Sequence, residues 1–271
     1  MSLTRILRSC SLAVMALTVA IFANAANAQQ PSPTLDAIQK RGTLRVGWAV
    51  IYPHFYRDPK TNQLTGVSHE IVEELAKSLN VKLELIEDNW ATLIAGIQSN
   101  KFDITIPSLA ITLPRALSVT YSRPVYQSAV GLMIRRDDLA KYKTWSDMDV
   151  QTARISVTLG SNADMFVTRA MTNSQILRVK AAPDSITQLL TGRADAWASP
   201  VDSFIKVGEE QPSLVRLPGP PVGYSKVSFA MKAGDYFFRD WVNYFIDELQ
   251  DTGTLLRIFK KYGLSEDSLV K

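Results

Sequence analysis

The most informative stretch of this chain is KFDITIPSLAITLPRALSVTYSRPVY, residues 101–126. Its apolar run from Phe102 to Pro107 predicts a buried strand, since Ile104 and Ile106 fall on one face of an extended chain. The run opens into a polar loop that carries Arg115. A guanidinium held just past a strand end offers a planar set of donors that matches both oxygens of a carboxylate. The stretch therefore predicts a carboxylate-binding arginine, although an ordinary surface arginine fits the same loop.

Strands and helices alternate on both sides of this stretch. We expect the first group to have strands at 44–47, 81–86 and 103–107 and helices at 35–40, 67–79 and 90–97. The pattern then restarts, with strands at 155–159, 176–179 and 195–198 and helices at 163–171, 184–190 and 199–207. Such alternation is typical of an α/β fold with mostly parallel sheets. The sequence therefore predicts two α/β lobes.

The C-terminal part of the chain is expected to return to the first lobe. Residues 228–231 are extended again, and amphipathic helices follow at 237–249 and 255–262. The expected division is lobe 1 at 35–132 and 228–271 and lobe 2 at 133–227. Two extended crossings, near 132–135 and 228–231, would then form a two-stranded hinge.

The first 28 residues have the pattern of a cleaved export signal. Arg5 and Arg8 precede a short apolar core at 11–22, and small residues at 26–28 supply a cleavage point, with 23–25 as an alternative. The apolar core is well short of the ~20 residues that a membrane span needs. We therefore expect the residues that follow to be exported as a soluble protein.

The composition excludes several kinds of chemistry. Cys10, the only cysteine, lies in the export signal, and the two histidines, His54 and His69, show no metal-ligand spacing. Removing Arg5 and Arg8 leaves 28 basic residues against 26 acidic ones, a net charge of +2 that favours neither nucleic acid nor an anionic membrane as partner. Phosphate-binding glycine loops and hydrolase motifs are also lacking. We expect no metal and no cofactor.

Landmarks along the chain resemble the solute-binding proteins of the polar amino-acid ABC uptake family. The matching pieces are Lys101-Phe102-Asp103, Ile111–Arg115, Tyr121–Tyr126, Gly42–Gly47, Gly66–Ile71, Trp90, Gly160-Ser161, Gly192–Ala196 and Gly253–Leu255. Each piece is weak alone, but the ordered set covers roughly 220 residues. The resemblance implies the type II periplasmic-binding-protein fold, in which two α/β lobes close on a solute.

The same resemblance implies a carboxylate site. Arg115 would hold the α-carboxylate of the ligand, beside the Ser108 hydroxyl and the backbone N–H of Ala110. Ser161 and Asn162 lie at a helix start, whose free N–H groups attract an anion, so they would close over the same carboxylate from lobe 2. An ordinary helix cap uses the same groups and needs no ligand.

Two aromatic residues and one proline complete the expected site. Tyr52 and Trp90 match positions whose rings sandwich the solute, although Trp90 also suits the core of an amphipathic helix. Pro200 stands where relatives carry an aspartate that pairs with the ligand's ammonium group. Asp202 is close by, but its position suits a helix cap better. Ala49 replaces another position that is often acidic in members that bind basic amino acids.

The function implied by the resemblance is that of the periplasmic substrate-binding component of an ABC uptake transporter. With both acids missing we expect a non-basic amino acid or a related organic acid as ligand, passed by a monomer to an ABC permease in the inner membrane. Cyclohexadienyl dehydratases resemble this family too, but their catalytic glutamate falls where this chain has Ser203, so we expect no enzyme. A sensory ligand-binding protein is the third alternative, and the lack of any membrane span before the chain ends at Lys271 argues against it.

Overall fold

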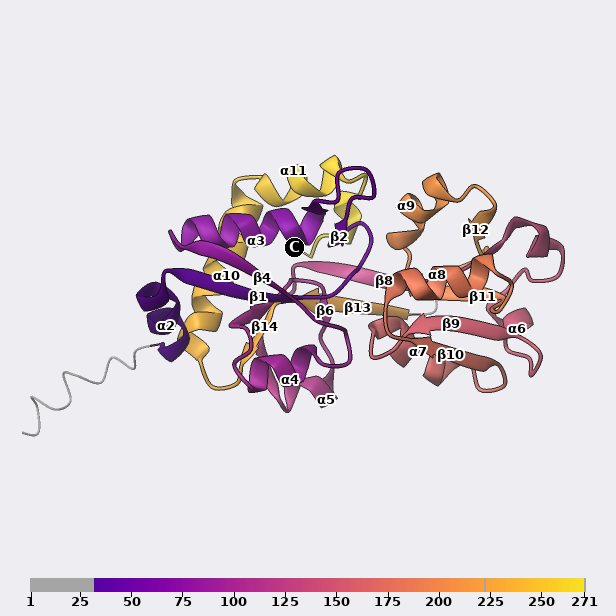
Figure 1. Cartoon of the computed structure of the whole chain (residues 1–271), viewed down its shortest axis with the longest axis horizontal. Helices are drawn as coiled ribbons and strands as arrows, with labels where there is room; N and C mark the ends of the chain where they lie inside the picture. The colour runs from indigo at the N-terminus through magenta and orange to yellow at the C-terminus, as the bar shows by residue number, and fades with distance from the viewer. Residues whose placement is uncertain (1–31, 222, 271) are drawn as a thin grey trace, which may run out of the picture.

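The structure, a computed structural model, describes residues 32–221 and 223–270. The expected export signal at 1–28 lies outside the described residues. Within them the chain forms two lobes that lie side by side, each with its own sheet and helices, and the C-terminus lies in the first lobe (Figure 1).

Lobe 1 is built around a five-stranded sheet of order β4-β1-β5-β14-β7. Its strands are β1 (Thr43–Trp48), β4 (Lys82–Glu87), β5 (Ile104–Thr105), β7 (Val119–Tyr121) and β14 (Ala230–Lys232). Its helices are α2 (Pro33–Arg41), α3 (Val67–Ser78), α4 (Leu93–Gln98), α5 (Leu113–Ala116), α10 (Tyr236–Asp251) and α11 (Thr254–Lys261). A small hairpin, β2 (Tyr56–Arg57) and β3 (Leu64–Thr65), extends it. In Figure 1, α3 and α11 lie above this sheet and α4 below it.

Helix α3 shows how the sequence pattern becomes packing. Its apolar residues recur at helical spacing, and Val67, Ile71 and Leu75 are completely buried. Gly66, which precedes the helix, has a φ of 125°, and a Cβ there would lie 2.3 Å from the carbonyl oxygen of His54. Glycine is therefore required at this position, and it allows the loop around His54 to pass close to the start of α3.

Lobe 2 contains the larger sheet, of order β10-β9-β11-β8-β13-β6, with β12 paired to β8. Its strands are β6 (Leu109–Ala110), β8 (Tyr126–Arg135), β9 (Arg154–Thr158), β10 (Gln175–Val179), β11 (Ala196–Pro200), β12 (Leu214–Arg216) and β13 (Gly223–Ser228). Its helices are α6 (Trp145–Met148), α7 (Asn162–Ala170), α8 (Ala182–Leu190) and α9 (Ser203–Glu210), with a short 3₁₀ turn at Arg136–Ala140. A second 3₁₀ turn, Glu266–Ser268, follows α11 in lobe 1.

Both sheets are mixed, so the expectation of mostly parallel sheets was wrong in this respect. Strands β4, β1 and β5 run parallel in lobe 1, as do β10, β9 and β11 in lobe 2. The remaining pairs are antiparallel, because the chain crosses between the lobes along β8 and returns along β13. An outward and a return strand that lie side by side must run in opposite directions.

The long strand pair β8 and β13 connects the two lobes (Figure 1). Tyr126, at the start of β8, and Val227, near the end of β13, belong to the hydrophobic core of lobe 1. Val130, four residues further along β8, belongs to the core of lobe 2. The core therefore changes between Tyr126 and Val130, a few residues before the crossing expected from the sequence.

Three local expectations need correction. Trp90 lies in a turn before α4 and not on the helix, because the Asp88 side chain binds the Thr92 hydroxyl and the Asn89 N–H and holds the chain in that turn. Pro200 ends strand β11 and does not open helix α9, because residues 196–200 pair with β8. Arg115 lies on the single-turn helix α5 and not in an irregular loop, because the Thr112 side chain caps that turn.

Candidate binding site

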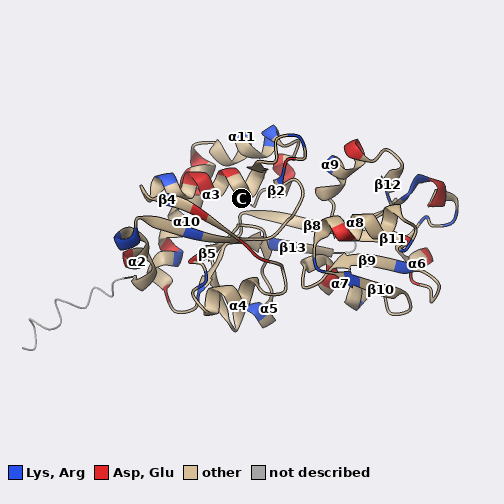
Figure 2. Ribbon diagram, in the orientation of Figure 1, with Lys and Arg blue, Asp and Glu red and all other residues tan. Residues whose placement is uncertain are grey.

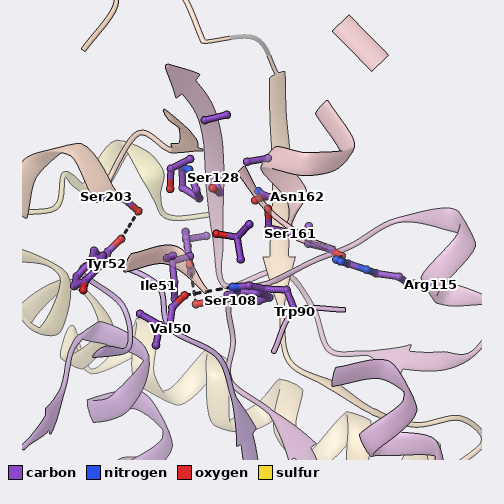
Figure 3. A pocket seen from close by; sticks show the side chains of 18 residues that line it. Val50, Ile51, Tyr52, Trp90, Ser108, Arg115, Ser128, Ser161, Asn162 and Ser203 are labelled. Carbon is purple, nitrogen blue, oxygen red and sulfur yellow. Dashed lines mark hydrogen bonds between the residues drawn. The ribbon is translucent and has the colours of Figure 1, made fainter. Parts of the chain in front are cut away.

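A hollow between the lobes is lined by residues from both of them (Figure 3). The lining residues are Val50, Ile51, Tyr52, Trp90, Ser108, Ala110, Arg115, Tyr126, Ser128, Thr158, Ser161, Asn162, Ala163, Ala182, Ala198, Ser199, Pro200 and Ser203. The space of the hollow totals about 510 Å³, part of it open to solvent. Residues of the two lobes face each other across this space.

All eight residues expected from the sequence to contact a ligand line this hollow. Arg115, Ser108, Ala110, Trp90 and Tyr52 approach from lobe 1 and its crossing strands, and Ser161, Asn162 and Pro200 from lobe 2. The structure therefore brings together positions that are up to 148 residues apart in the chain, and their role as ligand contacts stays a prediction.

Arg115 is the only charged residue among those that line the hollow. Its Nη1 donates to the carbonyl oxygen of Ala110 at 3.2 Å, and its Nη2 donates across the lobes to the carbonyl oxygen of Gly160 at 2.6 Å. Burial lowers the pKa of the guanidinium from its usual value, and the neighbouring Tyr121 hydroxyl opposes that shift. These two hydrogen bonds use two of the five N–H donors of the guanidinium.

The Ser108 hydroxyl is held by two buried neighbours. It lies 2.8 Å from the Ser68 hydroxyl and accepts a hydrogen bond of 2.9 Å from the Tyr126 hydroxyl. Burial raises the pKa of Tyr126 well above its usual value, so the phenol stays protonated and remains a donor. These contacts fix the orientation of the Ser108 hydroxyl at the wall of the hollow.

Ser161 and Asn162 form the start of α7, where the structure shows a helix cap. The Ser161 hydroxyl accepts a hydrogen bond from the backbone N–H of Asp164 at 3.2 Å. The Asn162 side-chain amide donates to the Ser225 hydroxyl at 3.1 Å. Their side chains are thus engaged, but the first N–H groups of a helix have no partner within the helix and remain suited to an anion.

The two aromatic residues have different surroundings. Trp90 is 8% exposed, packs in the core of lobe 1 and donates from Nε1 to the carbonyl oxygen of Val50 at 3.3 Å (Figure 3). Tyr52 packs against an apolar cluster of lobe 2, and its carbonyl oxygen accepts a hydrogen bond of 2.7 Å from the Ser203 hydroxyl (Figure 3). Tyr52 therefore links the lobes as well as lining the hollow.

The position of Asp202 suggested that it caps helix α9, but its side chain does not do so. Its side chain makes no capping hydrogen bond and lies 3.2 Å from Nε2 of His54, a fully buried residue of lobe 1. The imidazole stacks on the ring of Tyr126, with centroids 4.6 Å apart and planes 7° apart. His54 and Asp202 thus form a second polar link between the lobes, which sequence reasoning missed because the two residues are 148 positions apart.

Three further residues of the site were missed in the sequence. Ser128 on β8, Thr158 on β9 and Ser199 on β11 line the hollow, and each is 3–7% exposed. Their hydroxyls make no hydrogen bond to any residue that the structure describes. A buried serine or threonine in a strand has no local pattern that distinguishes it from an ordinary core residue, so only the fold reveals this group.

The lining is poor in groups that could perform acid–base catalysis. It contains no Asp, Glu, His, Lys or Cys, and its titratable side chains are those of Arg115, Tyr52 and Tyr126. Burial raises the pKa of both tyrosines, so neither is a base near neutral pH. Among residues 32–221 and 223–270 no cluster of acidic, histidine or cysteine side chains could hold a metal ion, and no helix is long and apolar enough to cross a membrane.

Two α/β lobes that meet over a shared hollow and are joined by crossing strands define the type II periplasmic-binding-protein fold, as expected. The chain belongs to the bacterial extracellular solute-binding proteins, family 3, which it matches over residues 44–265.

Similarities to individual proteins agree with this family assignment. The chain is similar to the probable amino-acid ABC transporter periplasmic-binding protein y4tE of Sinorhizobium fredii (strain NBRC 101917 / NGR234), with 25% identity over 282 residues, 99% of this chain and 92% of that protein. It also resembles the crystal structure of the ancestral amino acid-binding protein AncCDT-1, a precursor of cyclohexadienyl dehydratase, with a TM-score of 0.79, 27% identity and coverage of 84% of this chain and 99% of that one. The cyclohexadienyl dehydratase of Pseudomonas aeruginosa PAO1 is 23% identical over 246 residues, 89% of this chain and 90% of the enzyme.

Proposed function

We propose that this protein is the periplasmic substrate-binding component of an ABC uptake transporter and captures a small carboxylate-bearing solute. The ligand class is a non-basic amino acid or a related organic acid. The observation that carries the proposal is the position of Arg115, the single charged residue among those that line the hollow, with two of its N–H donors bonded to backbone carbonyls. A carboxylate there would gain two parallel charge-assisted hydrogen bonds.

Membership of family 3 supports the transport role, and the similarity to y4tE supports an amino acid or a related compound as ligand. Closure of the lobes over the solute would be the signal that an ABC permease recognises. Figure 2 shows both acidic and basic residues on each lobe, and we expect a monomer with no nucleic-acid partner.

The enzyme alternative lacks support in the site. Ser203, which stands where the dehydratases carry their catalytic glutamate, donates its hydroxyl proton to the Tyr52 carbonyl oxygen at 2.7 Å. No carboxyl group lines the hollow to take over that role. The likeness to a dehydratase therefore indicates a shared fold, and fold does not determine activity.

The test is binding to the refolded, ligand-stripped mature protein. A set of carboxylates and amino acids is screened by the shift in melting temperature, and each hit is measured by calorimetry, since a ligand that binds only the native state raises its stability. Arg115→Ala should abolish binding while the protein stays folded. Arg57→Ala, which removes an exposed arginine of the same lobe, is the matched control and should bind normally. Retained affinity in Arg115→Ala would refute the role of Arg115.

A further inference from the structure

The distribution of charge around the hollow is one-sided. Arg115 supplies one positive charge, and no carboxylate lines the space. The two nearby acids on lobe 2 are both engaged elsewhere. Asp202 pairs with His54, and Asp164 accepts hydrogen bonds from the Gly160 N–H and from Nε of Arg178.

This asymmetry matters for a ligand that carries an ammonium group. When the lobes close, such a group loses its water and finds no carboxylate in the lining of the hollow to pair with, which is costly for a buried cation. A second positive charge beside the guanidinium of Arg115 would add repulsion. The carboxylate end of the same ligand has no such difficulty. The site therefore suits an anion and disfavours a zwitterion.

The unused hydroxyls indicate what would replace the amine. Val157 of β9 pairs in parallel with Ala198 of β11, so the next residues, Thr158 and Ser199, emerge side by side at the same end of the sheet. Ser128 on β8 lines the same space. All three are buried and lack a partner among the described residues, and a hydroxyl both donates and accepts. They match a neutral oxygen on the ligand, either a hydroxyl or a carbonyl.

We infer that the preferred ligand is a small monocarboxylate with a hydroxyl or keto oxygen next to the carboxylate, in the place where an amino acid has its ammonium group. Arg115 binds the carboxylate, and the hydroxyls of Thr158, Ser199 and Ser128 bind the neutral oxygen. This inference rests on the proposed function and narrows its ligand class to 2-hydroxy and 2-oxo acids.

The experiment uses matched pairs that differ only at this position. Calorimetry compares L-lactate with L-alanine, glycolate with glycine and 2-hydroxyisocaproate with L-leucine on the ligand-stripped mature protein. We expect the best pair to favour the hydroxy acid by roughly tenfold or more, because the lining offers no carboxylate to offset a buried ammonium group. Equal or tighter binding of the amino acid overturns this inference and leaves the proposed function standing. If no carboxylate binds at all, both fail.

Substitutions at Pro200 test the charge argument directly. Pro200 ends β11 and lines the hollow, so Pro200→Asp adds a carboxylate and Pro200→Asn adds a neutral side chain of the same shape. We expect only the aspartate variant to shift preference toward the amino acid of a pair. If both variants shift the preference between hydroxy acid and amino acid equally, charge does not determine that preference and the inference is wrong. The same holds if neither variant shifts the preference while both melt as folded proteins.

The hydroxyl at Ser199 offers an independent readout. Ser199→Ala should weaken binding of L-lactate by about tenfold but leave propionate, which lacks the hydroxyl, unchanged. A purely structural effect would weaken both ligands alike. Equal losses for L-lactate and propionate would therefore contradict the assigned contact.

Discussion

Gly160 is the residue at which a single added methyl group should separate binding from folding. It lies in lobe 2, has a φ of 74°, and a Cβ added to it would be 2.7 Å from Cα and 2.9 Å from the backbone nitrogen of Ala91 in lobe 1. Ordinary contact begins at 3.4 Å, so Gly160→Ala forces the lobes apart by about 0.7 Å at this point, the difference between 3.4 and 2.7 Å. Backbone atoms cannot rotate away as a side chain can.

The displacement acts on the link between the lobes. The 2.6 Å hydrogen bond from Arg115 to the Gly160 carbonyl oxygen would stretch to roughly 3.3 Å, beyond the usual range for N–H···O. A hydrogen bond to a charged group contributes about 1.5–3 kcal/mol. Its loss should therefore weaken binding by roughly 10- to 150-fold, at 1.4 kcal/mol per factor of ten.

Gly192→Ala is the matched control. Gly192 also lies in lobe 2, with a φ of 71°, but no atom lies within 4 Å of its added Cβ. Both variants should lose about 1–2 kcal/mol of stability, because alanine is strained in the left-handed region. Only Gly160→Ala should lose affinity for the tightest carboxylate in calorimetry. If the two variants bind equally well, the contact between Gly160 and Ala91 does not limit closure and the reasoning fails.

Three other predictions concern the lobes and their link. Asp202→Ala should weaken every ligand by about tenfold in calorimetry without changing selectivity, since it removes the hydrogen bond to His54 and no ligand contact; a change confined to one ligand would contradict this. Burial raises the pKa of Asp235, but hydrogen bonds from Thr34, Phe238 and Ser32 outweigh it and lower the pKa below 3.8. The stability that this shift contributes is present above pH 3.8 and is lost as the pH falls through the folded-state pKa. Urea unfolding should therefore show that Asp235→Asn loses less free energy of unfolding between pH 7 and pH 3 than the wild type does. Phe102→Ala, at a side chain that is 1% exposed, should cost about 3–5 kcal/mol in urea unfolding, and a cost below about 1 kcal/mol would show that lobe 1 collapses around the gap.

The elements that the sequence predicted well are those whose pattern is local. The apolar stripe of α3 repeats at helical spacing, and the predicted helix at 67–79 agrees with the observed Val67–Ser78 and its C-cap Leu79. The wrong predictions concern elements whose secondary structure depends on residues far away in the chain. Pro200 belongs to a strand because β8, some 70 positions earlier, pairs with it, and proline in isolation is a better helix opener than strand residue.

The site shows the same division. The ordered landmarks of the family placed eight residues around one hollow, although their contacts with a ligand stay a prediction. The pair of His54 and Asp202 could not be found, because nothing near either residue identifies the other. Thr158 and Ser199 were missed for a related reason, since the register of β9 against β11 places their hydroxyls together.

We expect affinity and selectivity to depend on different groups of this protein. In the part of the chain that the structure describes, hydrogen bonds join the lobes from Arg115 to Gly160, from Ser203 to Tyr52, and between His54 and Asp202. Since the apparent dissociation constant is the intrinsic one divided by the fraction of closed protein, weakening these links lowers the affinity for all ligands by one factor. Pro200 and Ser199 take no part in these hydrogen bonds between the lobes, so their variants should change the ratio of the affinities for different ligands. Arg115 alone belongs to both groups, and its removal should reduce closure and carboxylate binding together.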